Sequence, residues 1–358
     1  MKIAVLGSGN GGHAVAFEWA EAGHDVYMYD FPQFSPSIDA IAEAGGIWAE
    51  GEMKGFAKLA YAGSDIEKVL AGAETVFIVG PAYSTEAFAK ACAPHVEEGQ
   101  SFVVMPGSCM GAVTFKHSLG IPMSDDSISV SETSTLPYAV RVTGPARISI
   151  FNKLPAGYMI ASLPRERNEE VYKTMKTVYK GLEKAESVFQ TSLQNSNPVI
   201  HPAVTTLNAA LIERTGGNFF FYNDGVTPAV GRLMQAVDDE RMSIGRALGL
   251  KILSDPELGV RQGYMTEANY VSGYNQAPGF DGIKAQSSLD YRYYNEDVGY
   301  TMVFWMDLAK RIGVPTPTME AMTRIVSIIM GRDYFAEAPR TLEKIGLGAY
   351  STEDLLKL

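Results

Sequence analysis

The sequence of 358 residues is short of cysteine, of long apolar runs and of positive charge. Cys92 and Cys109 are its only cysteines, too few for a disulfide scaffold and not in a metal-ligand spacing. No apolar run approaches the roughly 18 to 20 residues of a membrane span. The start MKIAVLG also lacks the organisation of a signal peptide. These absences predict a cytoplasmic protein without a metal site.

Basic residues number 30 and acidic residues 41, which gives a formal net charge of -11. There is no run rich in lysine and arginine, so a polyphosphate backbone would be repelled overall. We therefore expect no nucleic-acid or membrane partner, and look for small-molecule ligands instead.

Length and pattern predict two domains, because one compact core rarely exceeds about 250 residues. The first part of the chain alternates short β-rich runs with helical stretches, as expected for an α/β domain with a doubly wound parallel sheet. These runs are KIAVLG, HDVYMYD, KLAYAG, TVFIVG, SFVVMPG, ISVSETST, VRVTGPARISIF and GYMIASLP. A polar stretch with helical spacing at 165–185 is expected to close this domain, which we place at 1–188.

The remainder, 189–358, is predicted to be a mostly helical domain. Helices are expected at about 198–214, 228–248, 296–313 and 317–331, with Thr227 as an N-cap before Pro228 at the first helical position. The loops at 216–225 and 262–290 are rich in aromatic residues and glycine. They are candidates for a substrate-binding rim or for a subunit interface.

The first β-rich run leads into GSGNGG, which contains the spacing G-x-G-x-x-G as Gly7, Gly9 and Gly12. Such glycines allow a tight turn, close approach of a pyrophosphate and helix packing, and the helix N-terminus attracts the phosphate charge. Asn10 lies inside this turn. A second strand ends at Asp30, eighteen residues past Gly12, where a carboxylate can bind ribose hydroxyls. A flexible turn is the alternative, but the strand and helix context favours a dinucleotide site.

The cofactor is predicted to be NAD rather than NADP. A 2′-phosphate needs a nearby cation and would be repelled by Asp30. No lysine or arginine occurs between Lys2 and Lys54. Further cofactor contacts are expected where strands end, at Pro81 and Glu132, although each residue could simply shape a turn.

Hydride transfer between a nicotinamide and a carbonyl or imine carbon needs a group that handles the accompanying proton near neutral pH, and this group is most often histidine. His13 lies in the glycine turn region, His24 lies in a turn, and His95 and His117 fall near the ends of polar helical stretches. His201 remains, just beyond the expected domain boundary. A histidine that caps a helix or packs in an interface is the alternative.

The backbone around His201 has proline on both sides, at Pro198 and Pro202. Asn197 before Pro198 is typical of a helix start. Because Pro202 has no N–H, we expect the backbone here to be irregular or to begin its helix at this point.

A catalytic histidine usually has a carboxylate partner that fixes its tautomer. The segment SSLDYRYYNEDVGYTMVF contains Arg292 and Asp297 five residues apart. Arginine suits a substrate carboxylate, which it binds in a bidentate manner. By composition alone the pair could equally be a surface arginine and a helix-cap acid.

The sequence resembles the opine dehydrogenase family over nearly its whole length. The similarity is seen in VLGSGNGGHA, SLQNSNPVIHPAVTTLNAA, YNDGVTPAVG, RYYNEDV, VPTP and RTLEKIGL. Members of this family have a Rossmann domain joined to a helical domain, with the substrates bound between them. They use a nicotinamide cofactor to condense an amino acid with a 2-oxo acid, through an imine, to a secondary amine dicarboxylate.

The resemblance implies specific roles for four residues. The family's catalytic histidine falls on His201, its aspartate partner on Asp297, its carboxylate-binding arginine on Arg292, and an asparagine one helical turn earlier on Asn197. The resemblance is also compatible with a homodimer. Two other functions stay open: a dehydrogenase that interconverts 2-oxo and 2-hydroxy acids, and a non-catalytic NAD-sensing protein. The motifs do not identify the amino acid or the oxo acid.

Overall fold

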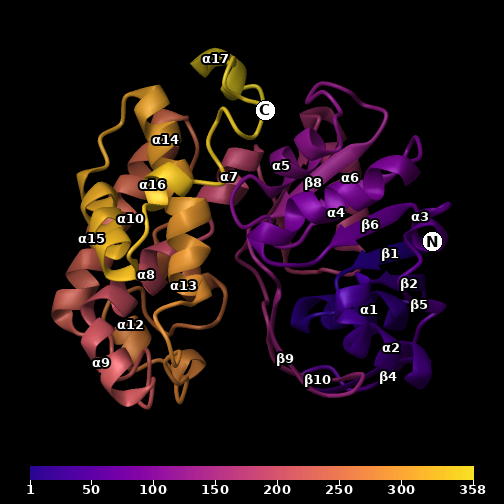
Figure 1. Ribbon diagram of the computed structural model, residues 1–358, viewed down its shortest axis with the longest axis horizontal. Coiled ribbons are helices and arrows are strands. Elements are labelled where there is room, and N and C mark those ends of the chain that lie inside the picture. The colour runs from indigo at the N-terminus through magenta and orange to yellow at the C-terminus, as the bar shows by residue number, and fades with distance from the viewer. The chain divides into compact units, whose positions relative to one another are not determined.

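The computed structural model describes residues 1–358, and the chain divides into two compact units. The first unit contains Met1–Leu154 and Tyr158–Thr191, with Leu358, and the second contains Pro155–Gly157 and Ser192–Lys357. All of the strands belong to the first unit, whereas the second is built from helices and loops (Figure 1). The prediction of a Rossmann-type α/β domain followed by a mostly helical one is confirmed.

The main sheet of the first unit has eight strands in the order β12-β11-β8-β7-β6-β1-β2-β5. Its strands are β1 (Lys2–Leu6), β2 (Asp25–Tyr29), β5 (Tyr61–Gly63), β6 (Thr75–Ile78), β7 (Ser101–Val104), β8 (Ser129–Thr133), β11 (Tyr158–Leu163) and β12 (Leu182–Lys184). All neighbours are parallel except β11 and β8. The central strands β1, β6 and β7 read KIAVL, TVFI and SFVV, and such apolar runs are typical of parallel strands covered on both faces.

A second sheet in this unit was not predicted from the sequence. It has four strands in the order β4-β3-β10-β9, which are β3 (Gly46–Gly51), β4 (Gly55–Lys58), β9 (Tyr138–Gly144) and β10 (Arg147–Lys153). Here only β3 and β10 are parallel. Strands β9 and β10 alternate buried and exposed residues, which indicates a sheet with one covered face. The run VRVTGPARISIF, which was expected to belong to the main sheet, forms parts of β9 and β10 in this second sheet instead.

Helix α1 (Asn10–Glu21) lies between the two sheets and contacts strands of both (Figure 1). This position explains why the continuous segment from Gly12 to Trp19 is buried instead of one face only. The other helices of the unit are α2 (Ser35–Ala44), α3 (Ile66–Leu70), α4 (Thr85–Cys92), α5 (Gly111–Ser118), α6 (Asn168–Lys176) and α7 (Val188–Leu193), the last crossing the division at Thr191. Short 3-10 turns lie at η1 (Pro32–Phe34), η2 (Ala82–Ser84), η3 (Ala93–His95) and η4 (Arg165–Arg167).

The stretch 165–185 is helical only in part. Helix α6 ends at Lys176, and the chain then adds β12 to the edge of the main sheet, parallel to β11. The spacing of apolar residues in this short strand could not be distinguished from the end of a helix.

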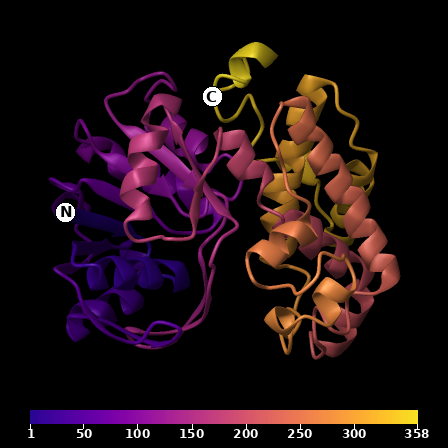
Figure 2. The same ribbon diagram turned by 180° about the vertical axis from the view of Figure 1, so that it is seen from behind.

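The second unit packs helices around α8 (Asn197–Leu207), which contacts α10, α13, α15 and the π-helix η6. Figure 2 shows the same helices from behind. Its elements are α9 (Ala209–Thr215), α10 (Pro228–Ala247), α11 (Asp255–Arg261), α12 (Ser272–Asn275), η5 (Pro278–Phe280), α13 (Arg292–Asn295), η6 (Asp297–Met302), α14 (Val303–Ile312), α15 (Pro317–Met330), α16 (Tyr334–Glu337) and α17 (Thr352–Leu355). The predicted helices at 228–248 and 317–331 are present as α10 and α15, and Thr227 caps α10 by accepting a hydrogen bond from the N–H of Val230. The helix expected at 198–214 is divided into α8 and α9 at Asn208, and the one expected at 296–313 consists of η6 followed by α14. No helix in the chain is both long and apolar enough to cross a membrane.

The expectation that Pro202 would disturb or begin a helix was wrong. Helix α8 begins at Asn197 and continues through Pro202 to Leu207. A proline this close to the start removes only one hydrogen bond, and Pro202 and its neighbours are buried by other helices. Tertiary packing therefore holds a helix that the local sequence disfavours.

Candidate active site

The turn after β1 is shaped by two glycines that the fold itself requires. Gly7 has a φ of +109°, and a Cβ there would lie 2.2 Å from the carbonyl oxygen of Val79. A Cβ at Gly12 would lie 1.8 Å from the carbonyl oxygen of Gly7. A Cβ at Gly9 would meet nothing within 4 Å. The chain's own packing therefore does not require Gly9, but the open space beside it fits a pyrophosphate at the N-terminus of α1.

Asp30 follows β2 and is joined to the glycine turn. One carboxylate oxygen, Oδ2, accepts hydrogen bonds from the N–H of Ser8 at 2.6 Å and from its hydroxyl at 2.7 Å. The other, Oδ1, accepts one from the N–H of Phe31 at 2.8 Å. The carboxylate is thus held beside the turn, at the carboxyl end of a strand where ribose hydroxyls are bound in this fold.

The three remaining cofactor candidates lie near the carboxyl ends of the strands. Asn10, at the start of α1, accepts a hydrogen bond from the N–H of Val142 through Oδ1. Pro81 follows β6 and begins the turn η2. Glu132 in β8 is completely buried, and it accepts hydrogen bonds from the N–H of Ala112 and the hydroxyl of Thr191. Glu132 therefore supports the start of α5 within the chain.

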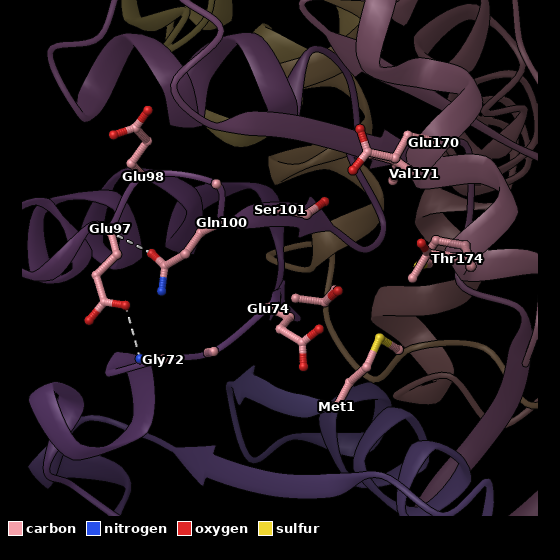
Figure 3. A pocket seen from close by; sticks show the side chains of 14 residues that line it. Met1, Gly72, Glu74, Glu97, Glu98, Gln100, Ser101, Glu170, Val171 and Thr174 are labelled. Atoms are coloured by element: carbon pink, nitrogen blue, oxygen red, sulfur yellow. Dashed lines mark hydrogen bonds between the residues drawn. The ribbon is translucent and has the colours of Figure 1, made fainter.

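A hollow of about 370 Å³ opens at the opposite end of the main sheet, where β6 and β7 begin (Figure 3). Its lining includes Glu74, Glu97, Glu98 and Glu170 and no lysine or arginine. Such a surface repels an anionic dinucleotide. The residues predicted to contact the cofactor lie at the other end of the strands.

In the second unit, the structure brings His201 and Asp297 together. Nδ1 of His201 lies 2.7 Å from Oδ2 of Asp297, and both side chains are buried. Asp297 begins η6, a six-residue π-helix, and π-helical turns occur frequently at functional sites. A carboxylate on Nδ1 fixes the tautomer that leaves Nε2 for proton exchange and supports a positive charge on the ring.

Two tyrosines lie beside the imidazole of His201, and neither was predicted as a site residue from the sequence. The ring of Tyr293 stacks on the imidazole with a centroid distance of 3.8 Å. The hydroxyl of Tyr222 lies 3.4 Å from Nε2. Both tyrosines belong to aromatic segments that the sequence marked only as candidate loops or as the neighbourhood of Arg292.

Arg292 lies at the start of α13, and its side chain is about half exposed. Its guanidinium forms an ion pair with Glu296 at 3.2 Å, and Glu296 is the residue directly before Asp297 in the sequence. Asn197 is the first residue of α8, one turn before His201, and the residue is partly exposed. Both side chains thus remain accessible to a small ligand.

No group of three or more His, Cys, Asp or Glu side chains is arranged to hold a metal ion. The fold and these side chains define a two-domain, nicotinamide-dependent dehydrogenase with a histidine-aspartate pair. Comparison with known proteins makes the assignment narrower. Residues 2–106 match the family model of the NAD-dependent glycerol-3-phosphate dehydrogenase N-terminus. Residues 184–330 match that of the NAD/NADP octopine/nopaline dehydrogenase alpha-helical domain.

Whole-chain relatives agree with this result. The opine dehydrogenase of Arthrobacter sp. (strain 1C) is 33% identical over 348 residues, covering 96% of this chain and 94% of the relative. Protein ocs of Agrobacterium tumefaciens (strain Ach5) is 25% identical, covering 93% and 92%. The structure of octopine dehydrogenase with NADH and agmatine superposes with a TM-score of 0.80 at 17% identity, covering 100% and 98%. The chain belongs to the opine dehydrogenase family and is an NAD-dependent oxidoreductase.

Proposed function

We propose that this enzyme condenses an amino acid with a 2-oxo acid such as pyruvate, through an imine, to a secondary amine dicarboxylate, and catalyses the reverse oxidation. The observation that carries the proposal is the buried pair of His201 and Asp297, 2.7 Å apart, in a chain 33% identical to an opine dehydrogenase. The Arthrobacter relative supports the class of reaction.

The first unit holds the cofactor. Gly7, Gly9 and Gly12 admit the pyrophosphate, and Asp30 binds the adenosine ribose and disfavours a 2′-phosphate. Asn10 and Pro81 border the same turn, and Glu132 contributes by fixing the start of α5. When bound, NADH supplies the hydride that reduces the imine carbon.

The second unit manages the substrates and the proton. Arg292 binds a substrate carboxylate, because a guanidinium offers paired donors to it. Asn197 orients a polar substrate atom. His201, with Nδ1 held by Asp297, exchanges a proton through Nε2 as the carbonyl becomes an imine.

The proposal is tested by following NADH oxidation with pyruvate or another 2-oxo acid, first alone and then with each member of a panel of amino acids. Oxidation that requires an amino acid supports the proposal and identifies the amine donor. Oxidation with the oxo acid alone would instead identify a hydroxy-acid dehydrogenase. Binding of NADH without turnover for any pair would support the NAD-sensing alternative.

Two further properties stay predictions. A cytoplasmic location is expected because Cys92 and Cys109 are both buried free thiols. A homodimer is expected from the family resemblance, and sedimentation analysis of the purified protein measures it directly.

A further inference from the structure

The phenol of Tyr222 lies on the side of the His201 ring that carries Nε2. Its hydroxyl lies 3.4 Å from Nε2, while Asp297 holds the other ring nitrogen, Nδ1. With Nδ1–H donated to the carboxylate, Nε2 is the atom through which the imidazole takes up and releases a proton. A proton that moves through Nε2 therefore passes beside the hydroxyl of Tyr222.

The position of Tyr222 is fixed by the chain itself. Its ring stacks on Tyr274 with a centroid distance of 5.7 Å and packs against Phe280 with a centroid distance of 4.6 Å. Only 6% of the residue is exposed. The loop that carries it is tied to α8 because the side chain of Asn208 donates hydrogen bonds to the carbonyls of Val204 and Gly225. The phenol and the imidazole are therefore held together before any substrate binds.

The hydroxyl of Tyr222 can either donate a hydrogen bond to Nε2 of His201 or accept one from it. Burial, assisted by the neighbouring phenols and carboxylates, raises the pKa of Tyr222 well above its ordinary value, so the phenol keeps its proton over the working pH range. It donates a hydrogen bond to Nε2 when His201 is neutral, and its oxygen accepts one from Nε2–H when the ring is protonated.

We propose that Tyr222 is a catalytic residue that passes the proton from His201 to the hydroxyl group that leaves when the carbinolamine becomes an imine. The inference rests on the proposed function. The phenol oxygen takes the proton from Nε2 as the phenol gives its own proton to the carbinolamine oxygen. The C–O bond then breaks with its electron pair on oxygen, water departs, and the nitrogen lone pair forms the C=N bond. Imidazole ends neutral and the iminium carries the charge.

The test compares the wild type with Tyr222→Phe and the control Tyr172→Phe. Tyr172 lies in α6 of the first unit, where its ring contacts Lys176. For each protein, kcat, both substrate KM values, the NADH Kd and the isotope effect on kcat with NADH deuterated at the transferred position are measured. Loss of the hydroxyl should lower kcat about 10- to 100-fold. The NADH Kd should stay within twofold of the wild type, and Tyr172→Phe should behave as wild type.

The isotope effect separates this role from a structural one. If Tyr222 acts in dehydration, the slowed step precedes hydride transfer, and the isotope effect in Tyr222→Phe is no larger than in the wild type. An isotope effect larger than that of the wild type would overturn the proposal, because hydride transfer would then be the impaired step. A fall in kcat of less than threefold would overturn it as well.

A second variant covers a failure of Tyr222→Phe to fold. Replacing Tyr222 by 3,5-difluorotyrosine keeps the hydroxyl and makes the phenol a stronger acid, so kcat at a fixed pH should change by about threefold or more while the NADH Kd stays within twofold of the wild type. An unchanged kcat contradicts the proposal. The proposed function itself fails only if the wild type shows no amine-dependent NADH oxidation, and an active wild type with an unimpaired Tyr222→Phe rejects the role of Tyr222 alone.

Discussion

Nδ1 of His201 lies 2.7 Å from Oδ2 of Asp297, although the two residues are 96 positions apart in the chain. Helix α8 carries the imidazole and the π-helix η6 carries the carboxylate, and the two elements are in contact. The pair is buried, so the carboxylate acts on the imidazole with little screening by water. This relationship is the basis of the first prediction.

Replacing His201 by alanine should lower kcat/KM for the amine-dependent reaction about 10²- to 10⁴-fold, because the proton would lose its carrier. Asp297→Asn should also be strongly impaired. The amide oxygen can still accept the Nδ1–H bond, but it carries no negative charge to stabilise the protonated ring. NADH affinity, measured by fluorescence titration, should not change. His117→Ala, an exposed residue of α5, is the control and should keep full activity. Normal kinetics in Asp297→Asn would remove the pair from the mechanism.

A substitution at Gly9 should weaken cofactor binding without lowering the stability of the fold. A Cβ at this position meets no protein atom within 4 Å, so Gly9→Ala should fold with a melting temperature within a few degrees of the wild type. The methyl group would occupy the space expected for the pyrophosphate, so the NADH Kd should rise about tenfold or more. Gly144→Ala in β9, where a Cβ has only Arg147 as a neighbour at 3.9 Å, is the matched control. Unchanged NADH affinity in Gly9→Ala would place the pyrophosphate elsewhere.

Asp30 should determine the choice of cofactor. Asp30→Asn keeps an oxygen that can accept the hydrogen bonds of Ser8 but removes the charge that repels a 2′-phosphate. The ratio of kcat/KM with NADPH to that with NADH should rise about tenfold, as expected for the loss of a close like-charge repulsion. Asp25→Asn, at the exposed start of β2, should leave the ratio unchanged. The argument fails if the wild type already uses NADPH as well as NADH.

Arg292 should affect binding more than turnover. Arg292→Lys keeps the charge but loses the paired donors, so KM for the substrate whose carboxylate it binds should rise about tenfold with a smaller effect on kcat. Steady-state kinetics with each substrate varied in turn identify which carboxylate is bound. Arg324→Lys, on the exposed surface of α15, is the control. Equal KM values for both substrates in Arg292→Lys and wild type would reject this role.

Asp255 should make stability depend on pH. Burial, together with the nearby carboxylate of Asp238, raises the pKa of Asp255 from 3.8 to about 7, against the opposing effects of Tyr274, Ser196 and Arg241. A raised pKa in the folded state gives a stabilising contribution that is complete below about pH 4 and is lost as the pH rises through 7. At about 1.4 kcal/mol per pH unit, the contribution is at most about 4 kcal/mol.

Asp255→Asn removes this titration. The melting temperature of Asp255→Asn minus that of the wild type should therefore increase between pH 5 and pH 8, as measured by calorimetry. Asp39→Asn, an exposed residue of α2, should show no such trend. A difference that is constant with pH would show that Asp255 does not titrate in this range.

Much of the fold was predictable because its signals are local. The glycine spacing, the apolar strands of the main sheet and the Thr227-Pro228 start of α10 each depend on a few neighbouring residues. The sheet formed by β3, β4, β9 and β10 was missed as a separate sheet because its pairing depends on cross-strand contacts and on α1, which local sequence does not show. The prediction at Pro202 was wrong for a similar reason. Packing against the surrounding helices outweighs the local preference of proline against a helix interior.

The sequence alone determined the NAD-binding turn, the order of an α/β domain and a helical domain, and the family, because these follow from residues near one another and from motifs along the chain. Only the tertiary structure decided which side chains meet. It brought Asp297 to His201 and placed Tyr222 at Nε2 and Tyr293 over the imidazole. It also showed that Glu132 supports α5. These contacts join residues that are tens of positions apart, and packing, which acts across such separations, leaves no periodic trace in the sequence.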